Sequence, residues 1–219
     1  DALERILGFK ATLGLHKAQK DGSIFRNEED LKVVGCEDHI ERAKQAADKG
    51  ITLVKNTLDQ LPIRPETHKR IRLYYLEGEK GGLLGDSDSL QTIVKELESR
   101  GFEVTVNDGN TRVKGPTLKY REEVDAALVF SNVVGYGAEN NYRIKWKMAM
   151  SNEVPWYVHE VPTVFVSLNY TTHLTDVPMV KCYINAYKDT EITIKSVIDK
   201  IMGESEFHGT PNENVWCNK

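Results

Sequence analysis

Residues 162–168 read PTVFVSL, an apolar run of strand length that is rich in β-branched side chains. A polar loop, NYTTHLTDVP (169–178), separates this run from a second one, MVKCYINAY (179–187), and the helix pattern DTEITIKSVIDKIMG (189–203) follows. Near-continuous apolar strands that alternate with helices are typical of a parallel sheet covered on both faces. This part of the chain therefore predicts an α/β fold.

The same alternation extends toward the N-terminus. Further strands are predicted at 51–56, 71–76, 102–106 and 125–131, helices at 1–16, 37–49 and 89–100, and a short polar or helical segment at 119–123. Gly50 and Gly101 are expected to follow two of these helices as C′ residues, and Asp88 with Gln91 to form a capping box. The pattern predicts a doubly wound, mostly parallel sheet of about six strands, which would bind ligands at the carboxyl ends of the strands.

Composition narrows the function classes. The 219 residues carry a net charge of −4, so they lack the basic surface that nucleic-acid binding requires. No apolar run approaches the roughly 20 residues of a membrane span, and no signal peptide is visible. The start at Asp1 suggests a piece of a longer protein. Three widely spaced cysteines without a pairing pattern favour a cytoplasmic location, and the histidines show no metal-ligand spacing.

A glycine-rich loop, EGEKGGLLGDSD (77–88), follows the predicted strand at 71–76. Glycine-rich turns after strands bind phosphates in many nucleotide-binding proteins. The spacing here fits neither G-x-G-x-x-G nor a P-loop, so we expect no nucleotide and no other cofactor. A nucleotide-binding regulator that uses this loop remains an alternative.

Three blocks of sequence resemble glycoside hydrolase family 3. AADKGITLVKNTLDQLPI (46–63) is similar to the family pattern A-x-x-G-x-x-L-L-K-N followed by L-P-L. The strand, loop, NAY strand end and helix closed by MGESEFHGTP (202–211) resemble the end of the C-terminal domain of the family. ERILGFKATLGLH (4–16) is similar to the last helix of its N-terminal barrel domain.

The resemblance implies a flavodoxin-like α/β sandwich at residues 37–219, preceded by a helix and linker (1–36) from a missing (β/α)8 barrel. It also implies a parent enzyme of the β-N-acetylhexosaminidase or β-glucosidase type, which cleaves β-linked sugars with retention. Family members carry the nucleophilic aspartate on the barrel, so this chain alone is expected to be inactive. The expected partners are the barrel domain and a carbohydrate substrate.

One predicted loop has the composition of a catalytic element. NVVGYGAENNYR (132–143) follows a predicted core strand, and glycoside hydrolysis needs two carboxyl groups on either side of the scissile bond. In the β-glucosidase branch the acid/base glutamate lies near a GEG-x-DR-like sequence, which implies Glu139 as acid/base and Arg143, Asn140 and Asn141 as substrate-binding residues. The loop lacks the second glycine and the aspartate of that pattern. In the N-acetylglucosaminidase branch, the acid/base residue comes from the barrel.

Other side chains give weaker indications. His173 and Asp176 are three residues apart and could pair as a general base, although a turn-capping role is favoured. Aromatic side chains could stack on sugar rings, but such residues lie more often in a core or an interface; they are Trp146, Trp156, Tyr157 and Tyr170. The alternative to a hydrolase domain is a non-catalytic flavodoxin-like module that binds a ligand or a protein.

Overall fold

The computed structural model describes residues 1–25, 27–78, 88–109, 118–133, 143–147 and 152–212. The chain forms two compact units, Asp1–Arg42 and Ala43–Lys219. Among the described residues, no helix combines the length and the apolar character needed to cross a membrane.

The first unit contains short helices with no buried residue. They are α1 (Ala2–Thr12), α2 (Leu15–Asp21), the 3-10 helix η1 (Glu28–Val33) and the start of α3 (Glu37–Gly50). The single helix predicted at 1–16 is wrong, because Gly14 has a φ of 68° and separates α1 from α2. The region predicted as a linker is accordingly helical in part.

The end of α3 differs from the prediction. Gly50 is the last residue of the helix rather than a left-handed C′ residue. The Ile51 amide still donates to the carbonyl of Ala47 at 3.2 Å, so the helical hydrogen bonding continues directly up to the first strand. Gly101, in contrast, has a φ of 95° after α4, as predicted.

Six strands form one sheet in the order β1-β6-β5-β4-β2-β3. The strands β2 to β6 are parallel and follow the flavodoxin order, so the predicted fold class is confirmed. An additional edge strand, β1, pairs antiparallel with β6. The strand bounds are β1 (Thr52–Asn56), β2 (Arg70–Glu77), β3 (Glu103–Val106), β4 (Ala126–Asn132), β5 (Thr163–Ser167) and β6 (Cys182–Asn185).

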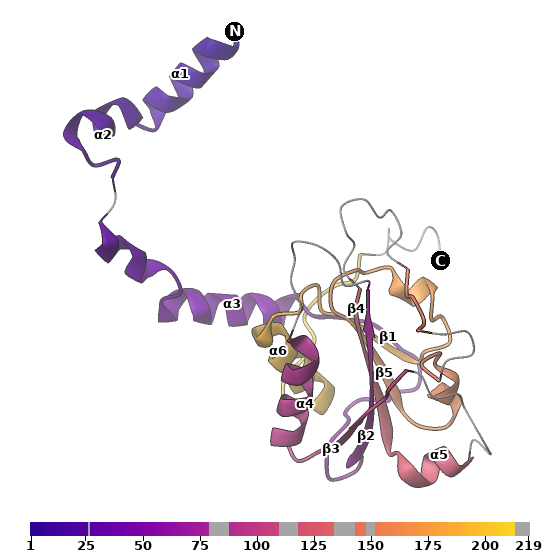
Figure 1. Ribbon diagram of the computed structural model, residues 1–219. Coiled ribbons are helices and arrows are strands. Elements are labelled where there is room, and N and C mark those ends of the chain that lie inside the picture. Colours follow the sequence, from indigo (N-terminus) through magenta and orange to yellow (C-terminus); the bar gives the residue numbers. More distant parts are fainter. Residues whose placement is uncertain (26, 79–87, 110–117, 134–142, 148–151, 213–219) are drawn as a thin grey trace. The chain divides into compact units, whose positions relative to one another are not determined.

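Two helices cover one face of the sheet, α4 (Ser89–Ser99) and α6 (Glu191–Met202) (Figure 1). Their apolar stripes meet alternate residues of the strands in the larger core, where Ile93, Val197 and Leu128 are fully buried. Thr190 caps α6, since its side chain accepts the amide of Thr193 at 3.3 Å. The capping box predicted at Asp88 is wrong, because its side chain makes no capping hydrogen bond to α4.

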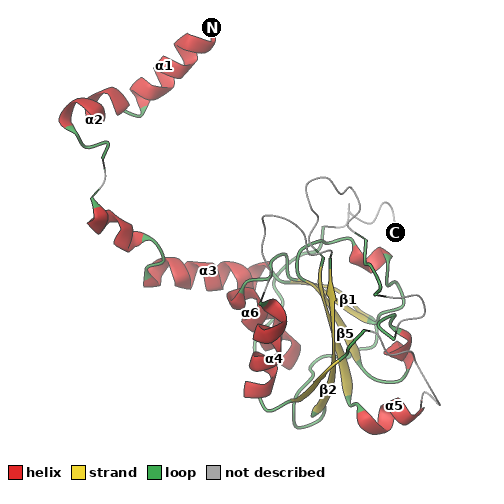
Figure 2. Cartoon of the chain, in the orientation of Figure 1, coloured by secondary structure: helices red, strands yellow, loops and turns green. Residues whose placement is uncertain are grey.

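The opposite face is covered by shorter elements. They are α5 (Leu118–Glu123) and the 3-10 helices η3 (Trp156–His159) and η4 (His173–Thr175), joined by loops (Figure 2). A second core lies beneath them, with Tyr74 and Tyr157 stacked at 4.2 Å between ring centroids. In the described parts of the β4–β5 and β5–β6 connections, coil and single 3-10 turns replace the long crossover helices of a regular doubly wound fold. Long polar loops therefore start at the carboxyl ends of β4 and β5.

Candidate functional site

The carboxyl edge of the sheet is the edge at which the five parallel strands end. At this edge β2 connects to β3 on one side, whereas β4 lies on the other side of β2. This arrangement creates a topological switch point between β2 and β4, where open α/β sheets bind their ligands. The apolar strands become polar at this edge, with Asn132, Ser167 and Asn185 ending β4, β5 and β6.

A switch-point network of five residues (Tyr75, Ser89, Asn132, Asn169 and Asp189) lies on the face covered by α4 and α6. Asn132 Nδ2 donates to the hydroxyl of Tyr75 at 2.9 Å and to Asp189 Oδ2 at 3.1 Å. Asn169 Nδ2 donates to Asn132 Oδ1, and the hydroxyl of Ser89 donates to the main-chain carbonyl of Asp189 at 3.2 Å. The network joins the ends of β2 and β4 to the connections that follow β5 and β6.

A histidine cluster (Ser131, Ser167 and His173) lies on the other face of the same edge. His173 Nδ1 is 2.8 Å from Ser167 Oγ and 3.3 Å from Ser131 Oγ, and all three side chains are buried. Ser167 also donates to the carbonyl of Tyr170. Because the two serines lie at the carboxyl ends of β4 and β5, as the penultimate residue of β4 and the last residue of β5, His173 fixes the loop after β5 to the sheet.

The clamp formed by Arg143, Ile144 and Asp176 joins the loop after β4 to the loop after β5. Asp176 Oδ1 accepts the Nε–H of Arg143, and Oδ2 accepts the main-chain amide of Ile144 at 3.0 Å. The Asp176 side chain is 6% exposed and that of Arg143 is 66% exposed. Arg143, predicted as a substrate-binding residue, thus lies at the carboxyl edge with a buried carboxylate behind it.

The structure gives His173 and Asp176, predicted as a possible pair, different side-chain partners. The imidazole contacts two serine hydroxyls, whereas the carboxylate contacts Arg143 and Ile144. Both residues belong to the turn at η4, since His173 begins it, Asp176 directly follows it and the Asp176 amide donates to the His173 carbonyl at 2.9 Å, but the N-cap of this turn makes no side-chain hydrogen bond.

A second buried carboxylate, that of Glu153, contacts the other end of the segment 143–147. Glu153 is 2% exposed, and its Oε2 accepts the amide of Lys147 at 3.1 Å while its Oε1 lies 3.6 Å from Lys147 Nζ. Lys147 Nζ also donates to the carbonyl of Asp108, which follows β3, at 3.4 Å. Residues 143–147 are thus fixed to the β5–β6 connection at one end and to the residue Asp108 after β3 at the other.

Other predicted site residues lie outside the described ranges. They are the acid/base candidate Glu139, the substrate-binding candidates Asn140 and Asn141, and most of the glycine-rich loop, residues 79–87. Their predicted roles therefore stay predictions. Within the described ranges, no three histidine, cysteine or acidic side chains are grouped as metal ligands.

The aromatic candidates for sugar stacking lie mostly in the second core. Tyr157 is fully buried, and Trp156 meets Tyr120 edge to face at 5.0 Å between centroids. Burial raises the pKa of Tyr157 well above its ordinary value and that of the Cys182 thiol to about 12, so both stay neutral at pH 7. The prediction that such residues belong to a core is confirmed for Trp146, Trp156 and Tyr157.

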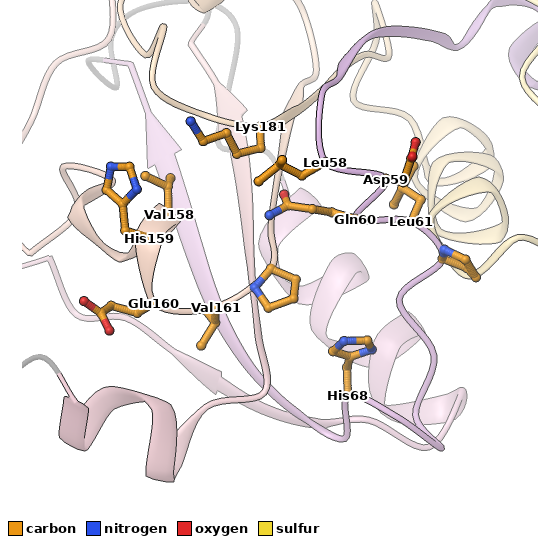
Figure 3. A pocket seen from close by; sticks show the side chains of 12 residues that line it. Leu58, Asp59, Gln60, Leu61, His68, Val158, His159, Glu160, Val161 and Lys181 are labelled. Carbon is orange, nitrogen blue, oxygen red and sulfur yellow. The ribbon is translucent and has the colours of Figure 1, made fainter.

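A groove of about 520 Å³ lies at the opposite, amino-terminal edge of the strands (Figure 3). The β1–β2 connection contributes Leu58 and His68, the segment before β5 contributes His159 and Glu160, and Lys181 precedes β6. An apolar hollow of about 420 Å³ lies between the end of α3 and the β6–α6 connection, beside Ala47, Ala186 and Tyr187. Neither hollow includes the clamp or the networks of the carboxyl edge.

The sequence reasoning missed Ser131, Ser167, Asn132 and Asp189. A signal was present, because β4, β5 and β6 each end in a serine or an asparagine at the edge where parallel strands bind ligands. No local sequence pattern indicates a contact between residues far apart in the chain, such as that of Asn132 with Asp189.

The fold and the polar carboxyl edge define the chain as a flavodoxin-like α/β sandwich domain. Comparison with known proteins indicates the class of protein to which such a domain belongs here. It is 32% identical over 222 residues to a protein from Cellulomonas fimi named β-N-acetylglucosaminidase/β-glucosidase; the match covers 99% of this chain and 39% of that protein. A solved β-glucoside phosphorylase, BglX, bound to 2FGlc, is 31% identical with a TM-score of 0.82, over 95% of this chain and 37% of that one. No family model matches the sequence.

A family 3 β-N-acetylglucosaminidase from Paenibacillus sp. str. FPU-7 shares the fold alone, with 16% identity and a TM-score of 0.55 over 81% of this chain and 32% of that one. The chain thus spans about two-fifths of the length of its curated relative, and the matched part is C-terminal. The resemblance to the C-terminal domain of glycoside hydrolase family 3 is confirmed.

Proposed function

We propose that this chain is the C-terminal domain of a larger enzyme that cleaves β-linked glucose or N-acetylglucosamine from non-reducing ends with retention. The observation that carries the proposal is the match over 99% of the chain, at 32% identity, to a protein named for both sugars. The 31% identical structure with a TM-score of 0.82 supports it, because that protein also acts on a β-glucoside.

Within that enzyme the domain packs on a catalytic barrel and forms one wall of the sugar site. Residues 1–36 form the helix and linker that leave the barrel, and residues 37–219 form the sandwich. No described residue of the first 36 is buried, and apolar side chains of this segment lie exposed, among them Leu3, Ile6, Leu7 and Phe9. Such a surface is typical of a segment that another protein surface covers. A cytoplasmic location belongs to the same proposal, because Cys36 and Cys182 are free thiols.

The loop after β4 contributes to the chemistry in this proposal. Glu139 protonates the leaving oxygen and later activates water, while Arg143, Asn140 and Asn141 hydrogen-bond the sugar. The partner carboxylate, which forms the covalent glycosyl-enzyme, belongs to the barrel. The exposed Arg143 at the carboxyl edge supports this assignment, since it lies where a doubly wound sheet meets its ligand.

Phosphorolysis is a second candidate, favoured by the 31% identity to a β-glucoside phosphorylase. In this case inorganic phosphate replaces water in the second step. A phosphate oxygen bonds to the anomeric carbon, the ester bond to the enzyme carboxylate breaks, and the sugar leaves as its 1-phosphate. Both candidates share the first step and differ in the acceptor.

The test uses the longer protein that carries this chain, and this chain alone as a control. The longer protein is expected to release nitrophenol from nitrophenyl β-glucoside or β-N-acetylglucosaminide, whereas the chain alone releases none above a mock purification. Added phosphate distinguishes the acceptors, because phosphorolysis gives sugar 1-phosphate and hydrolysis gives free sugar at any phosphate concentration. Failure of the longer protein on both glycosides would refute the proposal.

A further inference from the structure

We infer that Asp176 is a positioning residue that fixes Arg143 at the carboxyl edge for contact with the sugar, an inference that rests on the proposed function. Asp176 uses both carboxylate oxygens, one for the Arg143 Nε–H and one for the Ile144 amide. The first contact orients the guanidinium, and the second fixes the backbone that carries it. Asp176 does not itself touch substrate and acts through Arg143.

The position of Asp176 is itself determined by the core. Asp176 directly follows η4, whose first residue is the buried His173. The imidazole lies within hydrogen-bond distance of Ser131 and Ser167, which belong to β4 and β5. Because strand ends move little relative to each other, the carboxylate has a defined place at the edge. The strand ends therefore determine, through Asp176, where Arg143 lies.

The two charged side chains of the clamp differ in exposure, and this difference indicates a role beyond stabilising the fold. A carboxylate that is 6% exposed is costly to desolvate unless it is paired and hydrogen-bonded, and both conditions hold. Its partner is 66% exposed, and ion pairs with such exposed side chains contribute little to folding. A buried acid behind an exposed arginine suits a guanidinium that is presented to a ligand, since the guanidinium carries five N–H donors and sugar hydroxyl oxygens can accept hydrogen bonds.

The amino-terminal edge of the same sheet contains a matched control. Asp125 accepts the amide of Arg70 at 2.7 Å and its guanidinium Nη2 at 2.6 Å, which is the same combination of one amide and one arginine. Asp125 directly precedes β4 and Arg70 begins β2. The pair therefore lies at the edge of the sheet opposite the candidate site. Asp125→Asn should therefore weaken folding in the same way as Asp176→Asn without affecting sugar binding.

The experiment measures kcat and KM of the longer protein with nitrophenyl β-glycosides for Asp176→Asn, Arg143→Met, the double variant and Asp125→Asn. A misplaced binding group commonly lowers rates by about 100-fold, so we expect Asp176→Asn to reduce kcat/KM by about 10- to 100-fold. The kcat/KM of Asp125→Asn should stay within about two-fold of the wild-type value. Its thermal midpoint should nevertheless fall by about as much as that of Asp176→Asn. In the Arg143→Met background, Asp176→Asn should lower kcat/KM no further, because residues that act as one unit are not additive.

Three results would overturn the inference: an unchanged kcat/KM in Asp176→Asn, an equal loss in Asp125→Asn, or additive losses in the double variant. Amide exchange gives a readout that needs no activity. Asp176→Ala should speed hydrogen exchange at the Ile144 amide, and unchanged exchange would refute the clamp. A wild-type protein that cleaves no glycoside would refute the proposed function, while the exchange rate would still decide whether the clamp exists.

Discussion

Lys200 on α6 is the most deeply buried cation described in the structure. Its side chain is 0% exposed, and Nζ lies 2.9 Å from Asp48 Oδ1 and 2.9 Å from Ser205 Oγ. It also donates to the carbonyl of Glu206 and lies 5.5 Å from the centre of the Phe207 ring. These contacts connect α6, the end of α3 and the segment after α6, so one ammonium group holds three separate pieces of chain.

Lys200→Met should lower the free energy of unfolding by about 1–3 kcal/mol at pH 7, the usual cost of lost hydrogen bonds to a charged group. Lys200 holds the pKa of the Asp48 carboxyl below its ordinary value. A lowered pKa stabilises the fold above the unfolded value of about 3.9, and this contribution is lost as pH falls through the folded value. The difference in free energy of unfolding between the wild type and Lys200→Met should therefore become smaller below about pH 4. Urea unfolding at pH 7 and pH 3 measures it.

Lys195→Met on the same helix is the control, because Lys195 pairs at 2.6 Å with the exposed Glu191 and should change stability little. A loss in this control equal to that of Lys200→Met, or a deficit independent of pH, would contradict the role assigned to Lys200.

Glu139 offers a test of the chemistry in the longer protein. If it is the acid/base, Glu139→Gln should slow cleavage strongly for poor leaving groups and much less for good ones, which need no protonation. Azide should restore turnover where the second step limits the rate, because a small anion attacks without a general base. The measurement is kcat/KM across aryl glycosides of different leaving-group pKa, with and without azide. A flat dependence would place the acid/base in the barrel instead.

Helix α6 depends on its N-terminal cap, whereas α4 does not. Thr190→Ala should cost about 1 kcal/mol of stability, the usual value for a lost N-cap, because its hydroxyl accepts the Thr193 amide. Asp88→Ala should cost less, since the Asp88 side chain makes no capping bond to α4. Urea unfolding of the two variants tests the contrast. An equal or larger loss in Asp88→Ala would show that the α4 cap forms in solution.

Local patterns predicted the elements well and their termini less well. The runs that became β4, β5 and β6 are largely apolar because both faces of those strands are buried, so the strands were visible in the sequence. The break at Gly14 and the helical Gly50 were missed, since glycine adopts either conformation and its surroundings decide. The antiparallel pairing of β1 and the Arg143–Asp176 contact depend on residues far apart in sequence, and no local pattern reports such pairing.

At the scale of the whole molecule, the segment before α3 differs from the sandwich in its burial. None of its described residues is buried. A chain of residues 37–219 should therefore unfold at the same urea midpoint as the full chain, and it should bind less of a hydrophobic dye such as ANS because the apolar side chains of α1 are removed. A lower midpoint would show that residues 1–36 stabilise the sandwich directly and would contradict the proposed boundary.

The last prediction separates the sugar-cleaving domain from a nucleotide-binding regulator. The strand order is that of flavodoxin, which places a ligand site at the switch point between β2 and β4. In this chain Asn132 lies at the switch point and donates to the hydroxyl of Tyr75 at 2.9 Å and to Asp189 Oδ2 at 3.1 Å. The acidic Asp189 disfavours a phosphate there, and the glycine-rich loop at 77–88 lacks the consecutive Gly-Lys-Ser or Gly-Lys-Thr that ends a P-loop. ATP, NAD and FMN should therefore leave the thermal midpoint of the chain unchanged up to millimolar concentration. A concentration-dependent rise of several degrees with any of them would favour the regulator, because a ligand that binds only the folded state raises its stability by mass action.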